Sequence, residues 1–167
     1  MVEPKYFYRV QWCHSFTFYD NPDGFAARGH YWMDYSHWLN KNKIEHHLNW
    51  KDRSEQPTPF ISIFDNRRDA EERARHLANR GQRDVFIAEI HVPRLQSSTL
   101  EIVFGEKTVR LPALLHVDDD SGVTTFISTF AVQQHLGVDV RVSQRSEWFA
   151  LDYIPGRIVT RISIFGA

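Results

Sequence analysis

The residue types that most often perform chemistry are scattered along this chain of 167 residues, which has nine histidines and one cysteine. His46 and His47 are adjacent, so on a helix they would diverge by about 100° and could not easily share a metal ion. Cys13 and His14 are also adjacent, and neighbours in a strand point to opposite faces, which argues against a thiolate–imidazole pair. The acidic run at residues 118–120 lacks the alternating ligands and distal glutamate of a calcium loop. We therefore expect no metal site and no cysteine nucleophile.

Three segments that are far apart in the sequence form a more specific pattern. Arg9 lies in an aromatic, strand-like segment, and Ser62 lies in a Phe-Ile-Ser strand that leads into an alanine-bearing helix. Glu147 opens a hydrophobic strand that ends in Ile-Pro. In order, spacing and context these segments resemble the mono-ADP-ribosyltransferase superfamily, in the class whose signature runs Arg, Ser, Glu. The resemblance covers residues 8–158, and the chain also looks like an uncharacterised domain common in fungal proteins.

The resemblance implies an ADP-ribosyltransferase-like fold and NAD as co-substrate. It implies transfer of ADP-ribose to a protein or nucleic-acid acceptor, as in toxins and effectors, or hydrolysis of NAD. Glu147 would stabilise the positive charge that develops on the ribose as nicotinamide leaves. Arg9 would bind the pyrophosphate and the adjacent ribose, and Ser62 would orient the carboxylate or bond the ribose. Nicotinamide needs a flat apolar wall, for which the candidates are Phe64, Tyr19 and Trp32.

The same segments depart from the family pattern at two places. Arginine-directed transferases carry Glu or Gln two residues before the catalytic glutamate, and here that position is Arg145. The serine motif reads Ser-Ile-Phe in place of Ser-Thr-Ser, and a second Phe-Ile-Ser makes Ser128 a competitor of Ser62. We prefer Ser62 because a capped helix follows it directly. Transfer to another target, NAD hydrolysis, and a catalytically inactive ligand- or protein-binding module all stay open.

The elements that must position these residues predict an α+β fold with a mostly antiparallel or mixed sheet, because strands outnumber helices and no regular β–α–β alternation occurs. The clearest helix follows Asp65, a plausible N-cap, and places Ala70, Ala74 and Leu77 on one face before Gly81. Residues 19–30 read as a loop, residues 34–50 as one or two short helices, and residues 125–136 as either strand or helix. Predicted strands cover 5–12, 60–64, 84–92, 99–104, 107–111, 147–154 and 157–165.

Composition supports one folded domain spanning residues 1–167. Hydrophobic residues make up 42% of the chain and charged residues 25%, as in an ordinary globular protein. The net charge of −1 provides no global field that would attract nucleic acid or an anionic membrane. No apolar run approaches the length of a membrane span and no N-terminal signal pattern is visible, so we expect a cytoplasmic protein without a membrane partner.

Overall fold

The computed structural model describes residues 4–15, 17–27, 60–104, 106–118, 122–137 and 146–165. Within these residues the chain forms an eight-stranded sheet, a three-stranded sheet and two α-helices. The α+β class is therefore confirmed. All strand pairs in the described residues are antiparallel, so of the two expected alternatives the antiparallel one holds for this part of the chain and the mixed one does not. The predicted helical segment at residues 34–50 lies outside the described residues.

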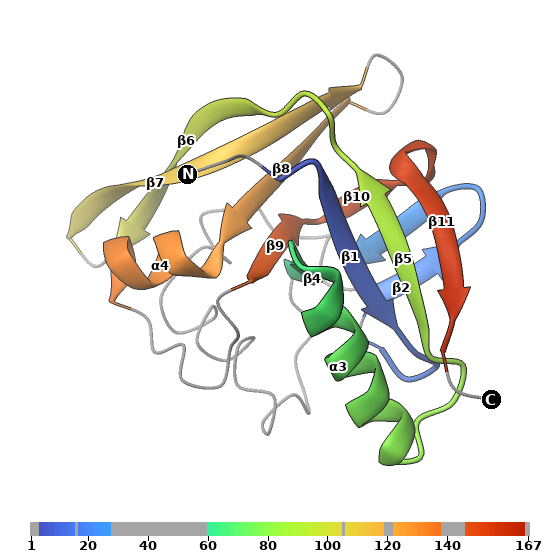
Figure 1. Cartoon of the computed structure of the whole chain (residues 1–167). Helices are drawn as coiled ribbons and strands as arrows, with labels where there is room; N and C mark the ends of the chain where they lie inside the picture. Colours follow the sequence, from blue (N-terminus) through green and yellow to red (C-terminus); the bar gives the residue numbers. More distant parts are fainter. Residues whose placement is uncertain are drawn as a thin grey trace.

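The large sheet has the strands of Arg9, Ser62 and Glu147 next to one another at its centre (Figure 1). Its spatial order is β11 (Val159–Ile164), β5 (Phe86–His91), β1 (Tyr6–Gln11), β4 (Phe60–Phe64), β9 (Glu147–Leu151), β8 (Gly122–Ser128), β7 (Lys107–Asp118) and β6 (Gln96–Phe104). Every residue of β4 and β9 is buried, as expected for apolar strands in the middle of a sheet. The outer strands β6 and β7 form the predicted hairpin, which is longer than the sequence indicated.

Helix α3 (Arg67–Asn79) covers one face of the large sheet. Its buried residues are Ala70, Ala74 and Leu77, which are the predicted core positions. The predicted N-cap was wrong by one residue, because the Asn66 side chain accepts the backbone N–H groups of the first turn. The carboxylate of Asp65 is consequently free of the capping role that the sequence suggested.

The ambiguous segment at residues 125–136 contains both a strand end and a helix. Strand β8 ends at Ser128, and α4 (Thr129–Leu136) begins at once. Ser128 Oγ accepts a hydrogen bond from the Ala131 backbone N–H at 3.1 Å, which caps α4. Val132 then packs against Phe149 of β9 in a second apolar cluster.

The small sheet has the order β10 (Tyr153–Pro155), β3 (Gly24–Ala27) and β2 (Thr17–Asp20). The loop predicted at residues 19–30 was therefore wrong where it overlaps β2 and β3. Gly24 has a φ of +104°, and a Cβ atom there would lie 2.1 Å from the carbonyl oxygen of Ile154. Only glycine fits this close approach of two backbones.

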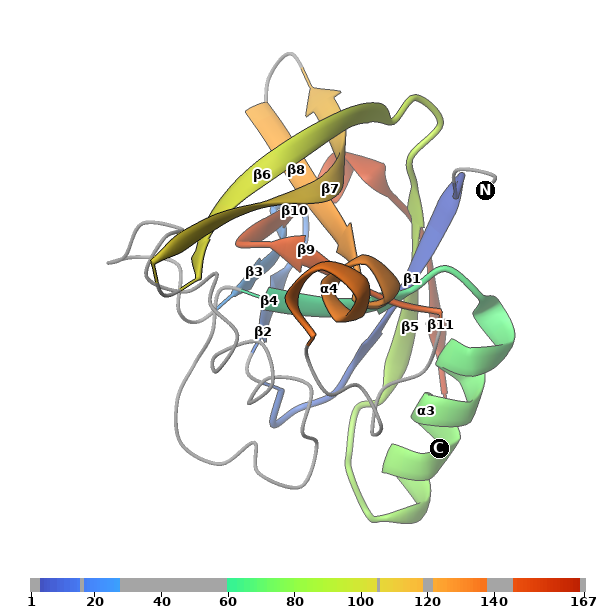
Figure 2. The same cartoon turned by 90° about the vertical axis from the view of Figure 1, so that its left-hand side faces the viewer.

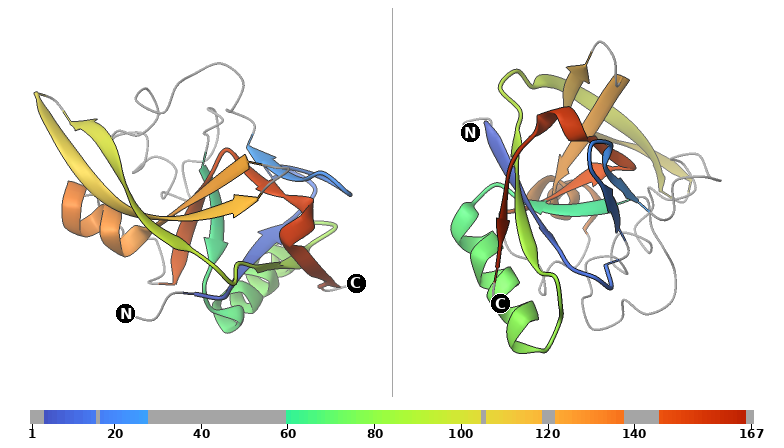
Figure 3. Two further views of the ribbon diagram at one scale, coloured as in Figure 1. Left: turned by 90° about the horizontal axis from the view of Figure 1, so that it is seen from above. Right: turned by 90° about the vertical axis from the view of Figure 1, so that its right-hand side faces the viewer.

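The two sheets and the helices form layers. Side-chain alternation divides the large sheet into a helix face, which bears Val10, Phe64 and Phe149, and a small-sheet face, which bears Phe7 and Ile63. In Figure 3 the helix α3 and the small sheet lie on opposite sides of β1 and β4. Figure 2 shows β6, β7 and β8 arching away from the part that α3 covers. No described helix is long and apolar enough to cross a membrane.

Candidate functional site

The three predicted motif segments meet along one row of the large sheet. Tyr8 of β1 pairs with Phe64 of β4, and Phe64 pairs on its other side with Glu147 of β9. Arg9 directly follows Tyr8 in this row, and Ser62 precedes Phe64 by two residues. Residues separated by more than fifty positions in the sequence are therefore brought to three adjacent strands.

The side chains of the three residues do not all leave the sheet on the same face. Directly opposed residues of an antiparallel pair project to one face, and the direction alternates along each strand. The register places Ser62 and Glu147 together on the helix face with Phe64. The same alternation directs Arg9 toward the small-sheet face, because its neighbour Tyr8 shares a face with Phe64.

Arg9 reaches back to the strand of Ser62 through its guanidinium group. Nη1 donates to the Ser62 carbonyl oxygen at 2.9 Å, and Nη2 donates to Ser15 Oγ at 2.7 Å. Nε and Nη2 both donate to Gln11 Oε1, at 3.1 and 2.9 Å. Gln11 Nε2 in turn donates to the Thr17 carbonyl oxygen at the start of β2. Arg9 is only 4% exposed, so it links β1, β4 and the small sheet from a buried position.

Glu147 begins β9 and is fully buried, at 0% exposure. Its carbonyl oxygen accepts a hydrogen bond from Thr129 Oγ1 of α4 at 2.9 Å, so the strand start is tied to the second helix. A buried carboxylate is a costly group that proteins retain where it has a partner or a task. The position of Glu147 beside Ser62 makes this row the candidate site.

The two candidate serines have different surroundings. Ser62 is buried in β4, between the strands of Arg9 and Glu147, and its carbonyl oxygen is held by Arg9. The hydroxyl of Ser128 serves as the N-cap of α4. A capping role explains why a serine occurs at position 128 without any catalytic requirement.

The predicted nicotinamide walls lie on different sides of the large sheet. Phe64 is packed beneath α3 in the cluster with Ala70 and Ala74. Tyr19 belongs to the small sheet and packs against Phe25 and Phe86, with ring centroids 4.7 and 5.2 Å away. These two rings therefore do not form opposite walls of one slot. Trp32 lies outside the described residues.

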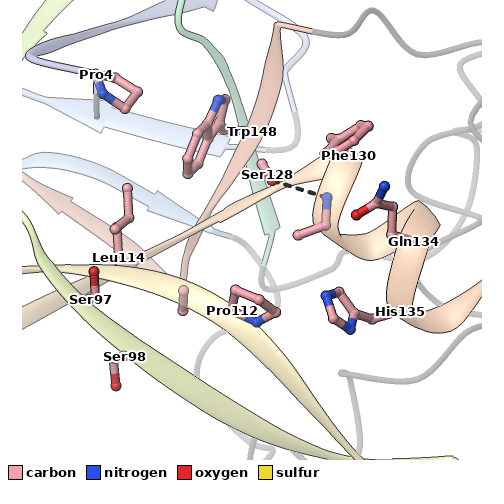
Figure 4. Close-up of a pocket in the computed structure, with 12 residues that line it drawn as sticks. Pro4, Ser97, Ser98, Pro112, Leu114, Ser128, Phe130, Gln134, His135 and Trp148 are labelled. Atoms are coloured by element: carbon pink, nitrogen blue, oxygen red, sulfur yellow. Dashed lines mark hydrogen bonds between the residues drawn. The ribbon is translucent and has the colours of Figure 1, made fainter. Parts of the chain in front are cut away.

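A separate cavity of about 330 Å³ opens beside Trp148, the residue that follows Glu147 (Figure 4). Apolar groups dominate its lining, which includes Trp148, Phe130, Pro112, Leu114, Ser128 and His135. Arg9, Ser62 and Glu147 do not line it. The lining residues come from β6, β7, β8, β9, α4 and the segment before β1, so their spacing in the sequence carried no signal that could have identified this cavity.

No three His, Cys, Asp or Glu side chains gather as a metal site requires within the described part of the chain. Searches of curated proteins and of solved structures gave no match to this chain. Residues 2–164 match a family model described as a domain of unknown function, DUF7587. Because the match covers nearly the whole sequence, the chain belongs to the DUF7587 family.

Proposed function

We propose that this protein cleaves NAD at the bond between nicotinamide and ribose, as an ADP-ribosyltransferase of protein or nucleic acid or as an NAD hydrolase. The observation that carries the proposal is the row formed by β1, β4 and β9. It brings the Arg, Ser and Glu segments onto neighbouring strands, with Ser62 and the buried Glu147 on the same face. An ADP-ribosyltransferase-like fold is part of the same proposal.

In the proposed reaction the nicotinamide nitrogen leaves with the electron pair of its bond to the ribose carbon. The ribose then carries positive charge, which a carboxylate stabilises more strongly in the transition state than in the ground state. Glu147 has this role, and Ser62 orients it or bonds the ribose. An acceptor oxygen or nitrogen, or water, forms the new bond to the ribose carbon and loses its proton.

Arg9 supports this site from the small-sheet face, opposite to the side chains of Ser62 and Glu147. Four of its hydrogen bonds run to Gln11, Ser15 and Ser62, and one of them fixes the backbone of Ser62. In the proposal Arg9 positions Ser62 and adds a permanent positive charge that favours the pyrophosphate of NAD. Direct bonding of the pyrophosphate to Arg9 would require exchange of some of these internal bonds.

A second candidate function is a catalytically inactive ligand- or protein-binding module on the same fold. Two observations favour it: Glu147 is fully buried, and the cavity beside Trp148 is lined by none of the three motif residues. Arg145 and the Ser-Ile-Phe motif point in the same direction. Under this alternative the apolar cavity takes the ligand, and NAD is not cleaved.

The experiment that separates the two functions measures nicotinamide release from NAD by the wild type, Glu147→Ala and Glu147→Gln. The transferase proposal expects Glu147→Ala and Glu147→Gln to lose about 100-fold or more of the rate, the usual effect of removing a group that stabilises transition-state charge. Glu101→Gln is a suitable control because its side chain is 66% exposed on β6. Equal background rates in all four proteins would favour the binding module.

A further inference from the structure

Both chain neighbours of Glu147 are attached to the beginning of α3. Ser146 accepts the Asp65 backbone N–H through its carbonyl oxygen at 2.9 Å, and it donates through Oγ to Asp69 Oδ2 at 2.5 Å. On the other side, Trp148 Nε1 donates to Asp65 Oδ2 at 3.0 Å. Three hydrogen bonds with Asp65 and Asp69 thus hold the two residues on either side of Glu147.

We infer that Asp65 and Asp69 are positioning residues, which hold Glu147 in its working orientation through Ser146 and Trp148. The inference rests on the proposed function, because it assigns these aspartates to the site that cleaves NAD. Neither aspartate is expected to touch the reacting atoms.

The anchor that the aspartates provide is rigid at the helix end. Asn66 caps α3 through two backbone N–H groups, one of which belongs to Asp69. Ala70 in the same turn is fully buried under the sheet. A side chain that extends from this turn therefore has a fixed origin, and a hydrogen bond from it transmits that position to Ser146.

The anchor is equally rigid at the indole end. Trp148 is 6% exposed and packs against Phe7, with ring centroids 5.2 Å apart. Its N–H group needs a partner when the ring is buried, and Asp65 supplies it. Adjacent residues of a strand point to opposite faces, so fixing the Trp148 ring on the small-sheet face also fixes the direction of Glu147 on the helix face.

A capping role does not account for the two acidic side chains. Asn66 already caps α3, and burial raises the pKa of the Asp65 carboxyl, as does the nearby charge of Asp69, while the hydrogen bond from Trp148 lowers it. The arrangement of the two side chains is accounted for by the bonds they accept from Ser146 and Trp148.

The test compares Asp65→Ala, Asp65→Asn and Asp69→Ala with the wild type in nicotinamide release, as separate kcat and KM values well below each melting temperature. We expect kcat to fall about 10- to 100-fold in the two alanine variants with KM changed less than about twofold, because misplacement of a catalytic group costs rate more than binding. Asp65→Asn keeps an oxygen that can accept from Trp148, so it should recover most of kcat. Glu72→Ala is the control, since it removes a half-exposed acid of the same helix.

A second readout does not depend on activity. The ¹³C resonance of the Glu147 side-chain carboxyl should shift in Asp65→Ala and in the milder Ser146→Ala, and should stay in place in Glu72→Ala. If the wild type releases no more nicotinamide than Glu147→Ala, the proposed function fails, and the positioning role is decided by this resonance alone. An unchanged resonance in Asp65→Ala and Ser146→Ala, or an unchanged kcat in an active enzyme, would overturn the inference.

Discussion

Two ionisable side chains, Arg9 and Glu147, are buried in neighbouring parts of one sheet row, where an ionised group needs compensating bonds. Arg9 obtains them from Gln11, Ser15 and the Ser62 carbonyl oxygen. The choice of arginine at position 9 is explained by this geometry. The planar guanidinium group directs donors from three nitrogen atoms toward these three oxygens, whereas the three donors of an ammonium group all come from one atom.

Arg9→Lys should therefore be destabilising even though the charge is kept. We expect the free energy of unfolding to fall by about 2–4 kcal/mol, because Gln11 and Ser15 lose charged hydrogen-bond partners inside the protein. Urea denaturation of the variant and of Arg110→Lys measures the effect, since Arg110 is 76% exposed and its ion pair with Glu101 is long, at 3.8 Å. Similar losses in both variants would argue against a structural role of the Arg9 network.

The carboxyl group of Asp65 makes the free energy of unfolding depend on pH. Burial raises the pKa of its carboxyl above the ordinary value of 3.8, with a further contribution from Asp69 and an opposing one from the Trp148 hydrogen bond. The folded carboxyl thus binds its proton more tightly than the unfolded one. The folded state holds more protons between 3.8 and the raised pKa, so this group makes the free energy of unfolding decrease as pH rises through that window.

Asp65→Asn removes this titration and keeps an oxygen for Trp148. We expect the variant to lose less stability, or gain more, than the wild type when pH rises from about 3 to about 6. Chemical denaturation at several pH values checks the difference, with the exposed Glu106→Gln as control. Parallel stability curves for wild type and Asp65→Asn would contradict the assignment.

At the scale of elements, local patterns predicted α3 well. Ala70, Ala74 and Leu77 recur at helical spacing, and the structure buries these three residues. The observed N-cap is Asn66 and not the predicted Asp65, because capping depends on the backbone geometry of one residue. Residues 125–136 were ambiguous for a physical reason: Ser128 ends a strand and caps a helix, so two periodicities meet at one residue.

The strands of the small sheet were harder to predict, because Asp, Asn, Pro and Gly at residues 20–24 are typical of loops. Their pairing depends on contacts with β10, from the other end of the chain. Gly24 is part of this tertiary constraint. Its φ of +104° and its approach to the Ile154 carbonyl oxygen are both visible only in the folded molecule.

Gly24→Ala should destabilise the protein more than Gly122→Ala. Both glycines have positive φ values, of +104° and +83°, but nothing lies within 4 Å of a Cβ atom at Gly122. Gly122→Ala should cost about 1–2 kcal/mol from backbone strain, and Gly24→Ala about 1–3 kcal/mol more from overlap with β10. Thermal and urea denaturation measure the difference. Equal costs would mean that β10 can move away from β3 freely.

At the scale of the whole molecule, the central row depends on long-range folding. Strands β1, β4 and β9 lie at sequence positions 6–11, 60–64 and 147–151, and they become neighbours only in the complete sheet. The sequence predicted each strand, because each is apolar and free of breakers. The opposite directions of Arg9 and Glu147 depend on the register between strands, which no local pattern specifies.

The same register separates two regions that a ligand could occupy. Ser62 and Glu147 project to the helix face, whereas the cavity beside Trp148 is lined by Phe130, Pro112 and their neighbours. The most direct test of the proposed function is therefore a crystal structure with a non-hydrolysable NAD analogue. We expect the nicotinamide ribose within hydrogen-bond distance of the Glu147 carboxylate. An analogue bound only in the Trp148 cavity, or no bound analogue at saturating concentration, would contradict it.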